Sequence, residues 1–258
     1  LNLDAIKAKL NQLNRNDDRR NNLWKPEAGK TRVRIVPYVH RKDNPFLELY
    51  FHYDIAKRSM LSPVSFGNAD PVVEFAEKLK KTGDKDEWLM GRKIEPKMRT
   101  YVPVIVRGKE ADGVKFWGFG KTIYTELLSI VSDPDYGDIT DLMNGRDIDV
   151  EFTPAEGGGY PKTAIRVKPN TSTATDDKAI AEKIMNQPTI TDIFPEPTYE
   201  ELENALKEWM NPEDDSSDVE TTTATTTDTT TKTESGTAAK SEEKQTDVAS
   251  AFNDLFNK

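Results

Sequence analysis

The stretch TYVPVIVRGKEADGVKFWGF, residues 100–119, decides the fold. Its two ends are rich in β-branched and aromatic residues, which favour strands. The segment between them begins and ends with glycine, which favours a turn. We therefore predict a β-hairpin with strands at residues 100–107 and 114–119 and a turn at residues 108–113.

Further strands are predicted on both sides of this hairpin. In residues 31–37, Val33 and Ile35 alternate with Arg32 and Arg34, as in a strand with one buried face. Residues 46–53 alternate as well. A second hairpin is predicted from residues 147–152 and 163–168, which flank a run of three glycines.

Helices are predicted between and after the strands. Asp70 and Pro71 are typical of a helix start. The helix that follows, at residues 71–81, has an apolar stripe formed by Val72, Phe75, Ala76 and Leu79. Further helices are expected at residues 121–132, 177–186 and 198–210, and a basic loop at residues 84–98. Short strands with interleaved helices predict a mainly β fold with α, built as a small barrel rather than a parallel doubly wound sheet.

The two ends of the chain differ from this core. Residues 1–22 are expected to be an arm with a short amphipathic helix, which packs on its own domain or on a neighbouring subunit. Residues 211–258 are acidic and rich in threonine, and they are expected to be disordered. Their apolar tip is interpreted as a docking peptide formed by Val248, Phe252, Leu255 and Phe256. The core is thus expected at residues 23–210.

Composition excludes several classes of site. The chain has no cysteine, so it has no disulfide, thiolate zinc site or cysteine nucleophile. Its only histidines are His40 and His52, so a three-histidine site cannot exist. No apolar run approaches the ~18 residues that span a membrane, and residues 1–10 are not expected to be a secretion signal. A chain without cysteine fits a reducing cytoplasm.

The charge is segregated along the chain. The total is −9, but residues 1–122 carry a net charge of +9, residues 123–210 carry −11 and residues 211–258 carry −7. A basic first half predicts a polyanionic ligand, and an acidic tail can compete with that ligand for the basic surface.

Cations and aromatic residues are interleaved in residues 91–121. The cations are Arg92, Lys93, Lys97, Arg99, Arg107, Lys109, Lys115 and Lys121, and the aromatic residues are Tyr101, Phe116, Trp117 and Phe119. Single-stranded nucleic acid needs this pairing, because cations neutralise phosphates and aromatic faces stack on unpaired bases. The alternative is that the aromatic residues are core and the lysines are solvated; for the cluster as a whole we favour binding.

Residues on other predicted strands are candidates for the same groove. Arg32, Arg34, Arg166 and Lys168 alternate along their strands in a way that permits them to line it. Tyr160 follows the three glycines, where it either stacks on a base or covers the end of the barrel.

Two candidate enzymatic motifs lack the residue spacing that they require. Residues 118–122 resemble the end of a phosphate-binding loop, but that loop needs a glycine at position 115, which is Lys115. Asp133, Asp135, Asp138 and Asp141 lack the spacing of a calcium loop, so a solvated loop is favoured over a metal-dependent nuclease site. We expect no catalytic residues and no enzyme.

The chain resembles the single-stranded DNA-binding, or helix-destabilising, proteins of large T-even-like tailed phages. The resemblance covers residues 20–210 in order. It rests on Trp24, Arg34-Ile35 with Pro37, Arg92-Lys93, Arg99-Thr100-Tyr101, Val104-Ile105-Val106, Gly113-Val114-Lys115-Phe116, Phe119-Gly120-Lys121 and Tyr199-Glu200-Glu201-Leu202. The acidic tail agrees in composition.

This resemblance implies an OB-fold, a five-stranded Greek-key barrel, with an inserted helical subdomain. It implies sequence-nonspecific coating of strands during phage DNA replication, recombination and repair in the cytoplasm of the infected bacterial host. It also implies self-association through the N-terminal arm, and replication and recombination proteins as partners of the acidic tail.

The family carries a zinc subdomain with one histidine and three cysteine ligands. His52 stands at the histidine position, but no thiolate remains. We therefore expect a cysteine-free remnant of that subdomain around residues 52–90, with no zinc or other cofactor. Two alternatives to DNA binding stay open: an RNA-binding module of the same fold, and an adaptor or assembly protein that binds no nucleic acid.

Overall fold

The computed structural model describes residues 7, 21–41, 43–56 and 59–210. Its internal contacts divide the chain into two compact units. The sheet unit takes in Leu1–Tyr50 and Met98–Glu196, and the helical unit takes in Phe51–Lys97 and Pro197–Lys258. The predicted arm helix, apart from Lys7, and the predicted tail with its docking tip lie outside the described residues.

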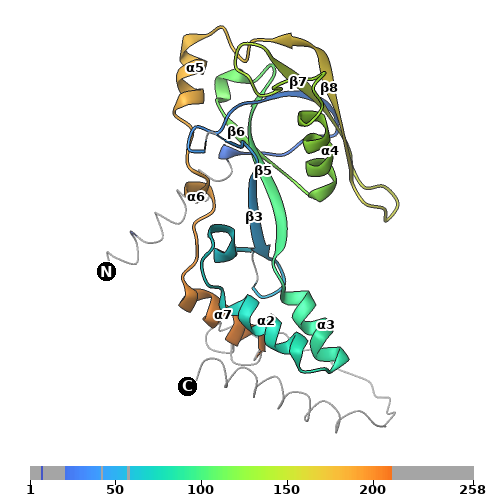
Figure 1. Ribbon diagram of the computed structural model, residues 1–258, viewed down its shortest axis with the longest axis vertical. Helices are drawn as coiled ribbons and strands as arrows, with labels where there is room; N and C mark the ends of the chain where they lie inside the picture. The colour runs from blue at the N-terminus through green and yellow to red at the C-terminus, as the bar shows by residue number, and fades with distance from the viewer. Residues whose placement is uncertain (1–6, 8–20, 42, 57–58, 211–258) are drawn as a thin grey trace, which may run out of the picture. The chain divides into compact units, whose positions relative to one another are not determined.

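The fold is mixed, with an eight-stranded sheet and six α-helices over the described ranges (Figure 1). The strands are β1 (Leu23–Trp24), β2 (Gly29–Ile35), β3 (Leu47–His52), β4 (Met60–Leu61), β5 (Lys97–Val106), β6 (Lys115–Phe119), β7 (Gly145–Thr153) and β8 (Lys162–Ser172). Their order is β1-β6-β5-β2-β7-β8, and β3 pairs with both β4 and β5.

Both predicted hairpins are confirmed. β5 and β6 are antiparallel, with Thr100 opposite Phe119 and Val104 opposite Lys115. β7 and β8 are also antiparallel, with Asp149 opposite Arg166. β2 lies between the two hairpins and pairs with β5 on one side and β7 on the other. The sheet so formed is large and open, and the closed barrel expected from the sequence is not confirmed.

The helices are α2 (Pro71–Lys81), α3 (Lys85–Ile94), α4 (Lys121–Val131), α5 (Lys178–Met185), α6 (Ile190–Ile193) and α7 (Tyr199–Met210), with 3₁₀ turns at Pro63–Phe66 and Glu110–Asp112. The predicted start of α2 is confirmed: the Asp70 carboxylate accepts hydrogen bonds from the backbone N–H groups of Val72 and Val73.

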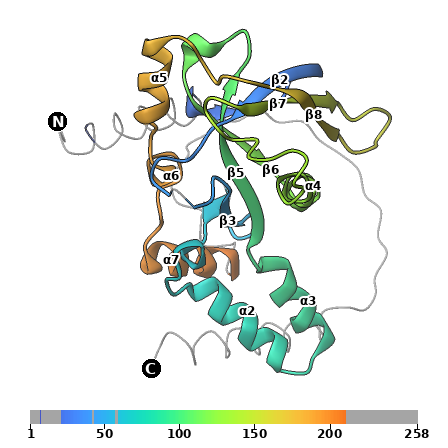
Figure 2. The ribbon, with the colours of Figure 1, turned by 45° about the horizontal axis from the view of Figure 1, so that its top comes forward.

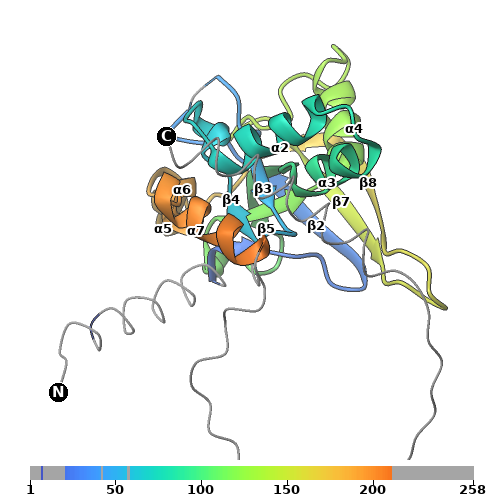
Figure 3. The ribbon, with the colours of Figure 1, turned by 90° about the horizontal axis from the view of Figure 1, so that it is seen from below.

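α3 replaces the basic loop that we predicted at residues 84–98, and that prediction was wrong. The Asp84 side chain accepts hydrogen bonds from the backbone N–H groups of Asp86 and Glu87, which caps the helix. Gly91 allows α3 to approach α2 closely, because a Cβ at that position would lie 2.7 Å from the carbonyl oxygen of Ala76. The two helices lie side by side (Figure 3).

Each unit has its own core. In the sheet unit, apolar residues of the sheet pack against α4, which lies beside the β7–β8 hairpin (Figure 2). This core includes Val33, Ile35, Val102, Val104, Trp117, Phe119, Ile123, Leu127, Ile148 and Val150. On the other side of β2 and β5, a smaller cluster contains Val36, Ile105, Val114, Ala174 and Ile184. In the helical unit, α2, α3 and α7 enclose Phe75, Leu79, Ile94, Leu202 and Leu206.

Candidate nucleic-acid interface

The four aromatic residues predicted to stack on bases are buried. Trp117 is 1% exposed and Phe116 is 0% exposed, and Phe119 and Tyr101 are also core residues. β6 pairs with β1 along one edge and with β5 along the other, and aromatic residues on both of its faces are buried. Trp117 packs on Trp24, and on the opposite face Phe116 packs on Tyr38. The structure therefore corrects the prediction: these four rings have no free face for a base.

Two of the predicted phosphate contacts, Arg34 and Arg107, are structural. The Arg34 side chain is fully buried and donates from Nε to Asp147 Oδ1 at 2.9 Å and from Nη1 to the Ser172 carbonyl at 2.9 Å. Arg107 also pairs with Asp147 and donates to the carbonyls of Thr173 and Ala174. Burial lowers the pKa of Arg34 from its ordinary value, and Asp147 offsets part of this effect.

These contacts attach the end of β8 and the residues after it to the sheet. Arg34 could contact a phosphate only by breaking its contacts inside the protein, and Arg107 could do so only by giving up its pair with Asp147, which is 14% exposed. The prediction that Arg34 and Arg107 line the groove is therefore corrected.

Three cations converge on Asp149 across three adjacent strands. Lys30 and Arg32 come from β2, Lys168 comes from β8, and each cation lies 2.9 Å from a carboxylate oxygen of Asp149. The Asp149 side chain is 3% exposed, whereas the cations are 32–54% exposed. Burial alone would raise the pKa of Asp149, but the three cations hold it well below its usual range.

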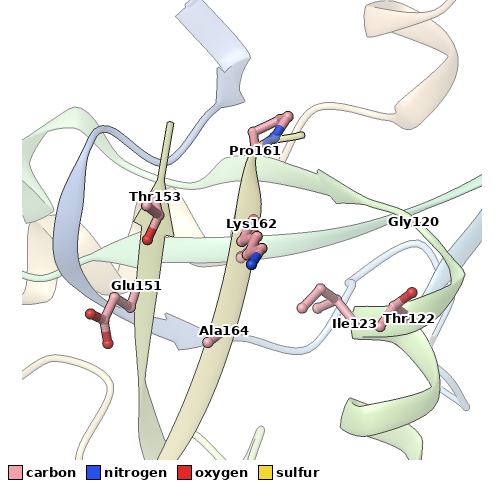
Figure 4. Close-up of a pocket in the computed structure, with 9 residues that line it drawn as sticks. Gly120, Thr122, Ile123, Glu151, Thr153, Pro161, Lys162 and Ala164 are labelled. Atoms are coloured by element: carbon pink, nitrogen blue, oxygen red, sulfur yellow. The ribbon is translucent and has the colours of Figure 1, made fainter. Parts of the chain in front are cut away.

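A groove of about 700 Å³ lies between the first turn of α4 and the outer ends of β7 and β8 (Figure 4). Its lining residues are Gly120, Thr122, Ile123, Glu151, Thr153, Pro161, Lys162, Thr163 and Ala164. Lys162 is exposed and was not among the predicted contacts, although it lies on the same strand as Arg166 and Lys168 at the same period of two.

Several predicted contacts lie around this groove. Lys121, the first residue of α4, is exposed and follows Gly120 of the lining. Arg99 is exposed and donates from Nη2 to the Gly118 carbonyl at 3.2 Å. Tyr160, beside Pro161 of the lining, is 89% exposed. Arg166 is exposed, and no ion pair of its guanidinium is found within the described ranges.

Lys115 lies outside this group. It is partly buried on β6, and its ammonium donates to the backbone carbonyl of Asn21.

Three further predicted cations belong to the helical unit. Arg92 and Lys93 are exposed on α3, and Lys97 Nζ lies 3.4 Å from Asp54 Oδ2. The Arg92 guanidinium lies over the ring of Trp88, 5.2 Å from its centroid, and Trp88 is 41% exposed. Trp88 was missed because its segment was interpreted as a loop; the Asp84 cap and the four-residue spacing to Arg92 are the signals that would have found it.

His52 is engaged by other protein groups and does not fit a zinc site. Its Nδ1 lies 2.9 Å from the Ile94 carbonyl and its Nε2 lies 2.9 Å from Asp70 Oδ2. Ser62 donates to the same Asp70 oxygen at 2.5 Å. Both ring nitrogens and the carboxylate are thus committed within the protein. Among the described residues, no three His, Cys, Asp or Glu side chains are grouped to hold a metal ion.

The aspartates of the loop after α4 shape its turns. Asp138 accepts hydrogen bonds from Thr140, and Asp133 accepts one from the backbone N–H of Asp135. Backbone N–H groups of Asn144 and Met143 lower the pKa of the Asp141 carboxyl.

No protein-family model matches the chain, and no curated protein matches it significantly. No helix in the described part of the chain is long and apolar enough to cross a membrane.

Proposed function

We propose that the chain binds single-stranded DNA without sequence preference, through the groove beside α4 and the adjoining outer face of β2, β7 and β8. By strand alternation, that face carries six cations and three carboxylates: Lys30, Arg32, Arg34, Lys162, Arg166 and Lys168, with Asp147, Asp149 and Glu151. Arg34 and Asp147 neutralise each other, which leaves an excess of three positive charges. This excess of positive charge, in a chain whose total charge is −9, is the observation that supports the proposal most.

Tyr160 offers an exposed ring that can stack on unpaired bases, which would make the interface prefer a single strand to a duplex. Its ring is almost fully exposed at the turn between β7 and β8, beside Gly157 and Gly158, which both have positive φ. Unpaired bases offer faces for such a ring, whereas the bases of a duplex are already stacked on one another. Lys162, two residues further on, provides the neighbouring phosphate contact.

The proposal extends to the fold and to the biological role. The curved part of the sheet with α4 is interpreted as a variant of the oligonucleotide-binding barrel. The chain then acts as a coating protein in phage DNA replication, recombination and repair in the host cytoplasm, without enzymatic activity and without zinc. The N-terminal arm serves self-association, and the acidic tail binds replication and recombination proteins.

The direct test is fluorescence anisotropy of labelled oligothymidylate titrated with the full chain at several salt concentrations. We expect binding that weakens steeply with salt, and much weaker binding to a duplex of the same length. Lys162→Gln should reduce the salt slope by about 0.7, the value of one phosphate contact on a single strand. Lys178→Gln, an exposed lysine on α5, is the matched control and should leave the slope unchanged.

The same titration separates the alternatives. Oligouridylate that binds more tightly than oligothymidylate would favour the RNA-binding module. If neither oligomer binds at low salt, the proposal fails, and the adaptor interpretation takes its place.

A further inference from the structure

We propose that the Asp149 carboxylate competes with DNA phosphates for Lys30, Arg32 and Lys168. This competition limits how tightly the interface binds the strand. This inference rests on the proposed function and assigns a residue that regulates it. The evidence is the arrangement of Asp149 with Lys30, Arg32 and Lys168 on the outer face of the sheet.

The position of Asp149 is fixed by the strand pairing. In the register of β2 with β7, Arg32 lies directly opposite Asp149, and in the register of β7 with β8, Arg166 lies opposite it from the other side. Side chains at such cross-strand positions share one face of the sheet and are close enough to interact. A carboxylate on the central strand of the three is therefore within reach of cations from both neighbours.

The exposure of the group is asymmetric. The carboxylate is nearly inaccessible, whereas Lys30 is 54% exposed and Arg32 is 47% exposed. The cations therefore cover the acid, and a phosphate arriving from solvent meets the cations first. Since a Lys ammonium has three donors and an Arg guanidinium has five, each cation can contact a phosphate while it keeps some contact with Asp149.

The charge of the cluster determines the effect on binding. Three cations around one carboxylate leave a net charge of +2 on this patch. Removing the carboxylate charge raises the net charge of the patch to +3 without adding a cation. Binding of the strand should then neutralise about one more phosphate and release about one more counterion. Asp149 thus lowers affinity and weakens its dependence on salt, which favours exchange of a protein that has to be displaced from the strand.

The test compares Asp149→Asn with Glu151→Gln in the full chain. Glu151 is exposed on the same strand and the same face, opposite Lys30 and in the groove lining, and its substitution removes the same formal charge, whereas Lys30, Arg32 and Lys168 form their ion pairs with Asp149. We expect Asp149→Asn to bind oligothymidylate more tightly at low salt. Its affinity loss between about 50 and about 200 mM salt should exceed that of the wild type by about threefold, from a slope steeper by about 0.7. Glu151→Gln should change both quantities less.

Equal or weaker binding by Asp149→Asn than by Glu151→Gln, with the wild type binding normally, overturns the inference and leaves the proposed function intact. If the oligomer binds to no variant, a second ligand tests the inference separately from the proposed function. Inorganic tripolyphosphate, followed by calorimetry, should bind more tightly to Asp149→Asn than to the wild type; equal affinities would reject the competitor role independently of DNA.

If Asp149→Asn fails to fold, Lys30→Gln provides a second test. Lys30 is half exposed, so its loss should be tolerated, and it removes one cation that the proposal assigns to the phosphates. The salt slope for oligothymidylate should fall by about 0.7. An unchanged slope would mean that Asp149 neutralises Lys30 in the bound state as well, which contradicts the proposal.

Discussion

Asp70 Oδ2 lies 2.9 Å from His52 Nε2, and neither side chain is exposed to solvent. Asp70 uses its other oxygen to cap α2, so one carboxylate links the end of β3 to the start of the helix. Ser62 completes the contacts of the carboxylate. The buried pair therefore joins three segments of the helical unit.

Asp70→Ala should strongly lower the free energy of unfolding of the helical unit. Removing the buried Asp70 carboxylate leaves its hydrogen-bond partners His52 and Ser62 unsatisfied, which typically costs about 1–3 kcal/mol for each buried group, and it also removes the cap of α2. Asp84→Ala removes the cap of α3, where the carboxylate is exposed, and should cost only ~1 kcal/mol. Urea unfolding of both variants, followed by far-UV circular dichroism, measures the difference. Equal losses would show that Asp70 acts only as a helix cap.

The stability of the protein should fall in acid partly through Asp70. Burial alone would raise the pKa of this carboxyl, but hydrogen bonds from His52, Ser62 and Val73 bring it below the ordinary value. A depressed pKa means that the stabilisation is fully present above the unfolded-state value of about 3.9 and is lost as pH falls through the folded-state value. Unfolding free energies of the wild type and Asp70→Asn should therefore converge below about pH 4. A constant difference down to about pH 2 would contradict this assignment.

Chelators should leave the folded protein unchanged. Both nitrogens of His52 already have protein partners, so the fold of this region does not depend on a metal ion in the way that zinc domains do. We expect the same Tm with and without EDTA, and no stoichiometric zinc in metal analysis of the purified protein. Bound zinc, or a Tm lowered by EDTA, would refute the prediction.

Local pattern predicted much of the fold. The β5–β6 and β7–β8 hairpins and the capped helix α2 follow from alternation, turn residues and an N-cap, all of which act over a few residues. α3 was missed because its apolar stripe is short and half of its residues are charged. Its stability comes from packing on α2 through Gly91, which no local pattern shows.

The site was harder to predict because it depends on distant partners. Alternation correctly separated the faces of β2, but Arg34 is neutralised by Asp147, 113 residues later in the chain. Alternation also placed Lys115, Trp117 and Phe119 on one face, and that face turned out to be core. A strand that is buried on both faces reads as a nearly continuous apolar run, and residues 114–119 form such a run apart from Lys115 and Gly118. Lys115 made the run look like alternation, so its aromatic residues were interpreted as stacking residues instead of core.

Tyr160 and Trp117 should give opposite results when each is replaced by alanine. Tyr160→Ala removes an exposed ring, so it should weaken binding of oligothymidylate by ~1–3 kcal/mol and leave the Tm unchanged. Trp117→Ala opens a cavity in the core and should cost about 3–5 kcal/mol of unfolding free energy. Anisotropy and thermal unfolding of both variants check this. If Tyr160→Ala binds as tightly as the wild type, the ring does not stack on a base.

Arg166 and Arg34 should also separate binding from stability. Arg166→Gln removes an exposed cation and should reduce the salt slope of binding by about 0.7 without changing the Tm. Arg34→Gln removes a buried cation from its contacts with Asp147 and Ser172, so it should destabilise the sheet unit by about 3 kcal/mol or more. The reverse result, a stable Arg34→Gln with weakened binding, would place Arg34 in the interface.

Deleting residues 211–258 should tighten DNA binding. This segment lies outside the described residues, but its net charge of −7 is set by the sequence. A tethered polyanion competes with DNA phosphates for the same cations, and the competition weakens as salt screens both. The truncated chain should therefore bind oligothymidylate more tightly at low salt, and the two affinities should converge at high salt. A full-length variant with the tail carboxylates replaced by amides separates charge from length: it should behave like the truncated chain. If it behaves like the wild type instead, the tail acts by its bulk, and electrostatic masking is wrong.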